Sequence, residues 1–245
     1  MIILIILTIA VFASWTLIPH RLTRYVIGSL FTVLFTALII GIVTNMTHHF
    51  GMEKEIITGP EKQIYSAGST KSPTNMLIAN EIGNNSYNYV MVYKENKNDD
   101  KPSAHFKPST SKVDLSDSIK KHAFYRTADV DQATVKTTKT YWTWKNDFYR
   151  YLFDFGNNKK ELIKQTSIVT VPNDTWVVLD AKQAKQLQKN QMASSKSQNR
   201  IKKELQNKMI AYKQSHPKAS EKQLENYIND QKQRLATKQI KEMLK

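Results

Sequence analysis

The sequence contains no cysteine, little glycine and, over its first 44 residues, no acidic side chain. The absence of Cys from 245 residues excludes a disulfide scaffold, a Cys-ligated zinc or iron–sulfur site and a thiol nucleophile. Seven Gly leave little material for a glycine-rich phosphate loop, and neither a Walker A nor a GxGxxG motif occurs. HExxH and GxSxG motifs are also missing, so no familiar zinc-hydrolase or serine-hydrolase signature is present.

The net charge of +15 is distributed unevenly along the chain. Residues 1–44 carry only Arg21 and Arg24, whereas residues 45–180 hold 18 basic and 16 acidic side chains. Residues 181–245 hold 16 basic and 5 acidic side chains, a net charge of +11. The sequence therefore predicts a membrane segment, a nearly neutral domain and a strongly basic tail in series.

Two long runs without a charged side chain open the sequence, Ile2–Ile18 and Val26–Thr44. They would span roughly 26 and 28 Å as helices, close to the ~30 Å hydrocarbon core of a bilayer. The first run lacks the basic segment of a cleaved signal peptide, so residues 1–45 are predicted to form a transmembrane helix hairpin. By the positive-inside rule, Arg21 and Arg24 place the connecting loop in the cytoplasm, and both termini are predicted to be extracytoplasmic.

Residues 53–180 alternate between apolar and polar side chains, which indicates half-buried β-strands. Turn-forming residues such as Gly83–Ser86 and Pro172–Asp174 separate the runs. The expected α+β fold is an antiparallel β-meander followed by a helical tail, with a long loop over 96–112 and a helical turn over 116–122. The predicted strands are Tyr87–Tyr93, Val135–Trp144, Phe148–Phe155, Ile163–Val171 and Thr175–Leu179.

Aromatic residues are concentrated in two of these predicted strands. Trp142 and Trp144 share one face of the first strand, and Tyr149 and Tyr151 share one face of the second. A turn at Asn146–Asp147 would place the two rows opposite each other. Flat rings of this kind form glycan-stacking faces, but they also form the hydrophobic core of a small sheet, and we favour the core.

The tail of residues 181–245 has no Gly and is rich in the helix-forming residues Gln, Lys, Ala, Glu and Leu. Apolar residues recur at helical spacing from Ile201 to Tyr212. Ser220–Gln223 has the form of a capping box that begins a further helix. Two helices that meet near Pro217 are therefore predicted.

The charge of these helices favours contact with a polyanion. Outside the cell, the available polyanions are anionic lipid headgroups and phosphate-bearing wall polymers. Nucleic acid is not expected, because it requires a cytoplasmic tail and no DNA-binding motif occurs. A solvated Lys face without a partner explains the charge equally well. The candidate polyanion contacts are Lys202, Lys203, Lys208, Lys232 and Arg234.

No group of residues in the sequence has the spacing of a catalytic, cofactor or metal site, so we predict a non-enzymatic protein without a cofactor. One alternative is a hydrolase of wall polymers that uses Asp147 or Asp154 near the aromatic face. Glycoside hydrolysis would require two carboxyl groups about 5–9.5 Å apart in a cleft. A second alternative is an accessory subunit of a membrane transporter, with the helix hairpin packed on the transporter.

Three features together give the sequence a family resemblance. They are the N-terminal apolar hairpin, Asn45 followed by His49–Met52, and a β-rich region that closes on Asp174–Asp180 before a Lys- and Gln-rich tail. This arrangement resembles a family of uncharacterised two-span membrane proteins of lactic-acid bacteria. The resemblance implies a Gram-positive cell envelope and assigns no activity to any residue.

Overall fold

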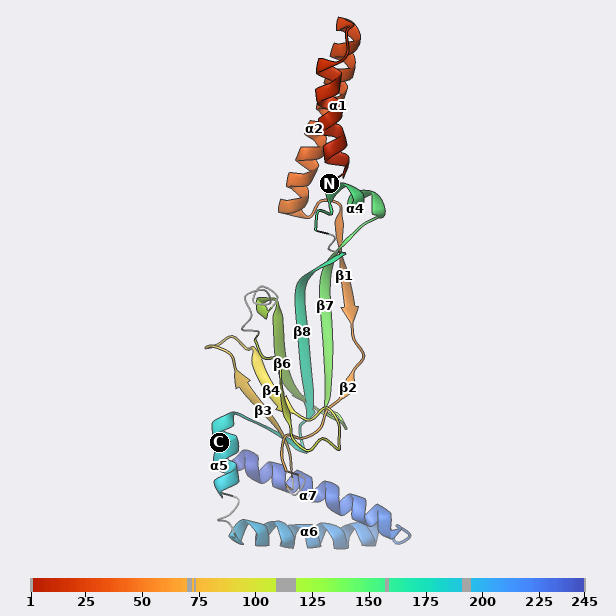
Figure 1. Ribbon diagram of the computed structural model, residues 1–245. Coiled ribbons are helices and arrows are strands. Elements are labelled where there is room, and N and C mark those ends of the chain that lie inside the picture. The colour runs from red at the N-terminus through yellow and green to blue at the C-terminus, as the bar shows by residue number, and fades with distance from the viewer. Residues whose placement is uncertain are drawn as a thin grey trace. The chain divides into compact units, whose positions relative to one another are not determined.

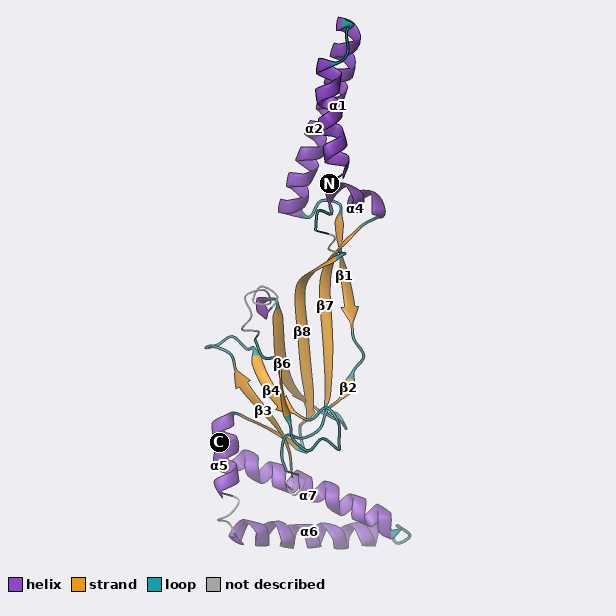
Figure 2. Cartoon of the chain, viewed as in Figure 1, coloured by secondary structure: helices purple, strands orange, loops and turns teal. Residues whose placement is uncertain are grey.

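The chain folds as two units, which are described separately below. Unit 1 comprises Met1–Ile57 and Lys139–Lys164, and unit 2 comprises Thr58–Thr138 and Gln165–Lys245. Figure 1 traces the chain and Figure 2 shows its secondary structure. The computed structural model describes residues 2–69, 72, 74–108, 118–156, 159–190 and 195–244.

Unit 1 begins with two apolar helices, α1 (Ile2–Thr16) and α2 (Arg21–His48), which pack side by side (Figure 1). The indole N–H of Trp15 donates a hydrogen bond to Thr32 Oγ1 at 3.2 Å, and its ring lies against Gly28. Within the described residues, α2 is the one helix long and apolar enough to cross a membrane, whereas α1 is a shorter apolar helix. The structure therefore supports one membrane-spanning or signal-like helix near the N-terminus.

The end of α2 explains the Asn45 and His49–Met52 motif. His49 adopts a left-handed conformation (φ 54°), and the N–H of Phe50 reaches back to the carbonyl of Thr44, as in a Schellman C-cap. The amide side chain of Asn45 donates to the Phe50 carbonyl at 2.7 Å. Gly51 follows with a φ of 83°, which only glycine adopts without strain. The motif therefore ends α2 and directs the chain into β1 (Met52–Thr58).

The segment that follows β7 (Thr134–Trp144) is a helix, so the predicted strand Phe148–Phe155 is wrong. The helix α4 spans Asp147–Phe153, and the side chain of Asn146 accepts a hydrogen bond from the Tyr149 N–H at its first turn. Nearly every residue in this segment is aromatic or apolar, so it satisfies helical and strand periodicity alike. The Asn146–Asp147 pair is a helix start rather than a hairpin turn.

Two sheets make up most of the remaining chain. One has the order β1–β7–β8–β6 with β2 paired to β7, and the other has the order β5–β4–β3–β9. The strands β7 and β8 are long enough to contribute residues to both units. The remaining strands are β2 (Lys62–Gln63), β3 (Asn75–Glu81), β4 (Tyr89–Tyr93), β5 (Ser103–His105), β6 (Lys121–Ala128), β8 (Lys160–Pro172) and β9 (Trp176–Leu179).

The predicted antiparallel meander is wrong, because each sheet contains a parallel pair. β3 pairs with β9 in parallel, and β6 pairs with β8 in parallel. Turn residues mark where strands end, but they do not specify which distant strand becomes the neighbour. Within the predicted loop over 96–112 the chain forms β5. Of the helical turn predicted over 116–122, Ser118 and Ile119 are helical, whereas His122 lies in β6. Residues 109–117 lie outside the described part.

The core of unit 2 lies between the two sheets. Trp176 packs with Leu77 and Met91 from one sheet and with Val169 and Val171 from the other. On the opposite face of β9, Val177 and Leu179 pack against helices. Successive residues of β9 thus enter two apolar layers, which explains why the strand reads as a continuous apolar run.

Three helices complete unit 2, one more than the two predicted for residues 181–245. They are α5 (Ala181–Asn190), α6 (Ser195–Ser215) and α7 (Glu221–Met243). The break between α6 and α7 lies at Pro217, and the capping box predicted at Ser220–Gln223 is formed. Helix formation in this segment is therefore confirmed.

Candidate functional site

The first candidate surface is a group of aromatic side chains around the C-terminal end of α2, here called the aromatic collar. Tyr149 of α4 lies against Gly51 and meets the Phe50 ring edge-on, with centroids 5.6 Å apart. Phe153 lies against Gly41, inside the apolar stretch of α2, and is buried. The lack of a side chain at both glycines therefore allows α4 to pack closely on α2. The aromatic collar consists of Phe50, Trp142, Phe148, Tyr149, Tyr151 and Phe153.

The arrangement of the collar differs from the two facing rows of aromatic residues that the sequence predicted. Trp142 stacks on His49 with ring centroids 4.4 Å apart, and Lys54 Nζ lies 5.2 Å from its ring centre. The indole N–H of Trp144 is buried without a hydrogen-bond partner in the described structure. Tyr149 and Tyr151 lie on a helix, so they do not form a row opposite the two Trp residues. Tyr151 is 65% exposed and is not a core residue.

The sequence did not single out Phe148 as a site residue. It also did not show that Gly41 and Gly51 are the positions against which the rings of α4 pack. Phe148 is 65% exposed, on the side of α4 that also presents Tyr151. Two signals indicated the helix: Asn146 is a good N-cap residue, and Asp147 is an acidic residue suited to the first turn. The partner of Phe153 is more than a hundred positions away in the sequence, so no local pattern identifies it.

The second candidate surface is the basic hairpin, formed by α6 and α7. The two helices are joined near the loop by Tyr212 and Tyr227, whose rings stack with centroids 4.1 Å apart. Near the other end, Arg200 pairs with Glu242 at 3.6 Å. The helix α7 docks on the sheet through Ile240, which packs with Val177, Leu179 and Leu187 of unit 2. The apolar side of α7 at Ile240 is therefore packed against the rest of unit 2.

The five predicted polyanion contacts divide into two groups. Arg234 pairs with Asp230 at 2.9 Å and with Asp174, and Lys208 donates to the Gln231 side chain at 2.8 Å. The pKa of Arg234 is raised, first by the hydrogen bond to Asp230. Lys202, Lys203 and Lys232 are exposed, and no hydrogen bond or ion pair engages them within the described ranges. Of the five predicted contacts, these three remain available to a ligand, and Lys213, Lys222 and Lys238 of the basic hairpin are exposed as well.

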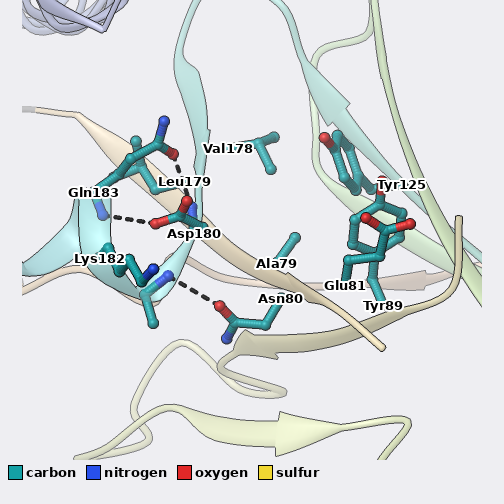
Figure 3. A pocket seen from close by; sticks show the side chains of 11 residues that line it. Ala79, Asn80, Glu81, Tyr89, Tyr125, Val178, Leu179, Asp180, Lys182 and Gln183 are labelled. Carbon is teal, nitrogen blue, oxygen red and sulfur yellow. Dashed lines mark hydrogen bonds between the residues drawn. The ribbon is translucent and has the colours of Figure 1, made fainter. Parts of the chain in front are cut away.

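A pocket of about 500 Å³ lies beside the N-terminus of α5 (Figure 3). Two of its polar side chains accept hydrogen bonds within the protein: Asn80 accepts from the Ala181 N–H, and Asp180 accepts from the Gln183 N–H. At its other end, Tyr89 meets Tyr125 edge-on at 4.9 Å. Burial, and then the neighbouring Tyr125 and Glu81, raise the pKa of Tyr89. We assign no ligand to this pocket.

The carboxylates proposed for a hydrolase lie on α4. Asp147 is exposed and pairs with Arg150 at 3.1 Å, and the Asp154 N–H closes the C-terminal turn of α4 on the Arg150 carbonyl. Neither residue lines the pocket beside α5. Across the described ranges, no three His, Asp or Glu side chains gather as a metal site.

Comparison with known proteins gives one match. Residues 20–187 match the model of the family described as "Domain of unknown function (DUF4811)". The match confirms the expected resemblance to an uncharacterised family and extends from the N-cap of α2 into α5. The helices α1, α6 and α7 lie outside it. No curated protein and no solved structure matches the chain.

Proposed function

Because the chain belongs to the DUF4811 family, whose function is unknown, we propose its role from its own surfaces. It is a membrane-anchored, non-enzymatic protein of the cell envelope, and its basic hairpin binds anionic phosphate groups of a wall polymer or lipid. The helices α1 and α2 both span the bilayer, and both termini are extracytoplasmic. The observation that carries this proposal is the set of free cations on the basic hairpin, in a chain whose α2 is apolar enough to span a membrane.

Exposed apolar side chains support the membrane anchor. Ile9 and Phe12 of α1 and Leu30 and Val33 of α2 are all more than half exposed. Such a surface is unfavourable in water but suits lipid. The 28 residues of α2 extend about 42 Å, which exceeds the hydrocarbon core. The shorter α1 packs along α2, so we place both helices in the bilayer together.

The charge of the basic hairpin supports a polyanion as the ligand. Among the described residues, Lys202, Lys203 and Lys232 have no acidic partner, whereas Arg234 is paired. A Lys near an anionic surface contributes about 1 kcal/mol to attraction, and salt screens this term. Three such residues therefore account for roughly a hundredfold in affinity.

The first experiment tests topology. Protease is added to intact cells from which the wall has been stripped, and the fragments are identified by mass spectrometry. The proposal expects cleavage within unit 2, with a protected fragment that contains α2. Full protection of unit 2 would reverse the orientation and contradict an envelope role.

The second experiment tests the ligand. The full chain in neutral-lipid nanodiscs is mixed with anionic vesicles in one arm and with purified wall polymer in the other, at low and high salt. The triple variant Lys202→Gln, Lys203→Gln, Lys232→Gln is then compared with the native chain. Its affinity for the true ligand, either the anionic vesicles or the wall polymer, should be roughly a hundredfold lower. The matched control replaces three exposed Lys of unit 2 outside the hairpin, Lys97, Lys101 and Lys136, by Gln.

Two results would contradict the proposal: equal losses in the hairpin variant and its control, or binding that does not change with salt. An accessory-subunit role would instead appear as co-purification of a transporter in mild detergent, unaffected by the Lys substitutions.

A further inference from the structure

The helix α4 has two aromatic faces, and only one of them has a partner among the described residues of unit 1. Tyr149 and Phe153 face α2, where they contact Gly51 and Gly41. Phe148 and Tyr151 point away from these contacts, and each is 65% exposed. A seven-residue helix that leaves two large rings exposed in this way needs an apolar or interfacial environment for its outer face.

The contact between Phe153 and Gly41 fixes where α4 lies along α2. Gly41 precedes the last residue of α2, His48, by seven positions, or about 10 Å along the axis. The whole helix exceeds the ~30 Å hydrocarbon core by about 12 Å, which leaves about 6 Å at each end if it is centred. Phe153 therefore lies at the level where α2 enters the bilayer, whereas Tyr149, against Gly51, lies just past the end of α2.

The residues of α4 match the chemistry of the headgroup region. Aromatic side chains, above all Tyr and Trp, concentrate where hydrocarbon meets water. The guanidinium of Arg150 lies 5.4 Å from the centre of the Tyr151 ring and pairs with Asp147 at the exposed side of the helix. In the headgroup region the exposed Arg150–Asp147 pair stays hydrated or meets lipid phosphates, whereas an apolar protein face over it would desolvate both charges.

We propose that α4 is an interfacial helix, which lies in the lipid headgroup region against α2 with Phe148 and Tyr151 inserted among the lipids. The partner of this surface is the bilayer itself. The inference rests on the proposed function, because it requires α2 to span a membrane. It adds a second point of attachment, about a hundred residues further along the chain.

The absence of native Cys permits a direct test with single-Cys variants of the full chain in phosphatidylcholine vesicles. Phe148→Cys and Tyr151→Cys report on α4, Val33→Cys reports on the span, and Lys97→Cys reports on unit 2. Each variant receives an environment-sensitive fluorophore, and quenching is measured with lipids spin-labelled at the headgroup, high on the acyl chain or near its end.

The proposal expects the fluorophores at positions 148 and 151 to lose most of their fluorescence to the headgroup and shallow quenchers. The fluorophore at position 33 should respond to the deep quencher, and that at position 97 to none. If the fluorophore at position 33 is quenched but those at positions 148 and 151 are not, the interfacial placement of α4 is wrong. The membrane anchor formed by α2 is then still supported. Absence of quenching at 33 as well would overturn the proposed function itself.

Two variants are used because each replaces only one of the two exposed rings. Both variants keep Tyr149 and Phe153, which hold α4 against Gly51 and Gly41. A protein partner on this face would appear as shielding of 148 and 151 from every lipid quencher together with slow reaction towards a water-soluble maleimide. That result would also overturn the inference.

Discussion

The aromatic collar and the basic hairpin are both attached to the rest of their units by few contacts, but these contacts differ in kind. The collar is attached through two rings that lie on glycines, with no ion pair between α4 and α2 among the described residues. The basic hairpin is attached through the buried Ile240 side chain, a hydroxyl pair, one ion pair to Asp174 and a hydrogen bond from Lys241 Nζ to the Asn173 carbonyl. Each attachment uses chemistry that remains effective in the surroundings we propose for it.

This difference suggests how each surface responds to its environment. Packing of Phe153 on Gly41 does not require water and is not screened by salt, so it suits a segment in the membrane interface. The ion pairs of Arg234 are exposed and depend on ionic strength, as does any contact of the free Lys residues with a polyanion. The comparison predicts that detergent and lipid affect the collar, while salt affects the hairpin.

The largest expected effect comes from removing the apolar attachment of the basic hairpin. Ile240 is 4% exposed and packs with Val177 and Leu179, so Ile240→Ala should lower the free energy of unfolding by about 2–5 kcal/mol. Urea unfolding of the full chain in detergent, followed by circular dichroism, measures this loss. Ile210→Ala, at an exposed site of α6, is the matched control and should change little. Equal stabilities would show that α7 does not depend on this contact.

The attachment of the collar is tested at Gly51. An Ala at this position would adopt a φ of 83° and place its Cβ 2.6 Å from Tyr149 Cδ1. The left-handed conformation alone costs roughly 1–2 kcal/mol, and the ring must also move. We expect Gly51→Ala to lower the thermal midpoint in detergent and to speed hydrogen exchange in α4. The control is Gly83→Ala, which has a similar φ but open space, so it isolates the conformational cost.

A smaller effect distinguishes hydroxyl pairing from apolar packing beneath α7. Thr74 and Thr237 are both buried, and their hydroxyl groups share a hydrogen bond. Thr237→Val should cost about 1–3 kcal/mol, because the hydroxyl of Thr74 loses its partner. Adding Thr74→Val removes the second hydroxyl and should restore part of the loss. If the double variant is as unstable as the sum of the single variants, apolar packing rather than hydroxyl pairing dominates this contact.

The smallest effect is expected at the exposed ion pairs. Arg234→Gln removes the pairs with Asp174 and Asp230 and should cost about 0.2–1 kcal/mol. The loss should shrink when the unfolding midpoint is measured at 1 M salt, where the Debye length is about 3 Å. A loss that persists unchanged at high salt would identify packing of the Arg234 side chain, rather than its charge, as the stabilising contribution.

Local signals predicted much of the secondary structure. The alternation in β7 and β8, the apolar run of β9 and the capping box at Ser220 each depend on neighbouring residues, and each prediction is confirmed. The parallel pairing of β3 with β9 depends on residues about a hundred positions apart, so the turns between them carried no information about it. Pairing of distant strands is decided by the shared core around Trp176.

The candidate site was predictable in composition but not in arrangement. The sequence indicated that Tyr149 and Tyr151 matter together with Trp142, yet placed them on a strand. The helix α4 corrects this, because it keeps Tyr149 and Phe153 on one face and turns Tyr151, which a strand would place beside them, to the exposed side. In the tail, the charge was evident, but only the structure separates paired Arg234 from the exposed Lys202.

The position of β3 between β4 and β9 has a consequence for synthesis of the chain. When Asn75–Glu81 leaves the ribosome, its later neighbour Trp176–Leu179 has yet to be translated, and Ile240 follows later still. Until then β3 has one unpaired edge, and the apolar face that α7 will cover is open to other chains. Folding of unit 2 therefore has to wait for almost the entire polypeptide, which makes its nascent form a natural client for chaperones.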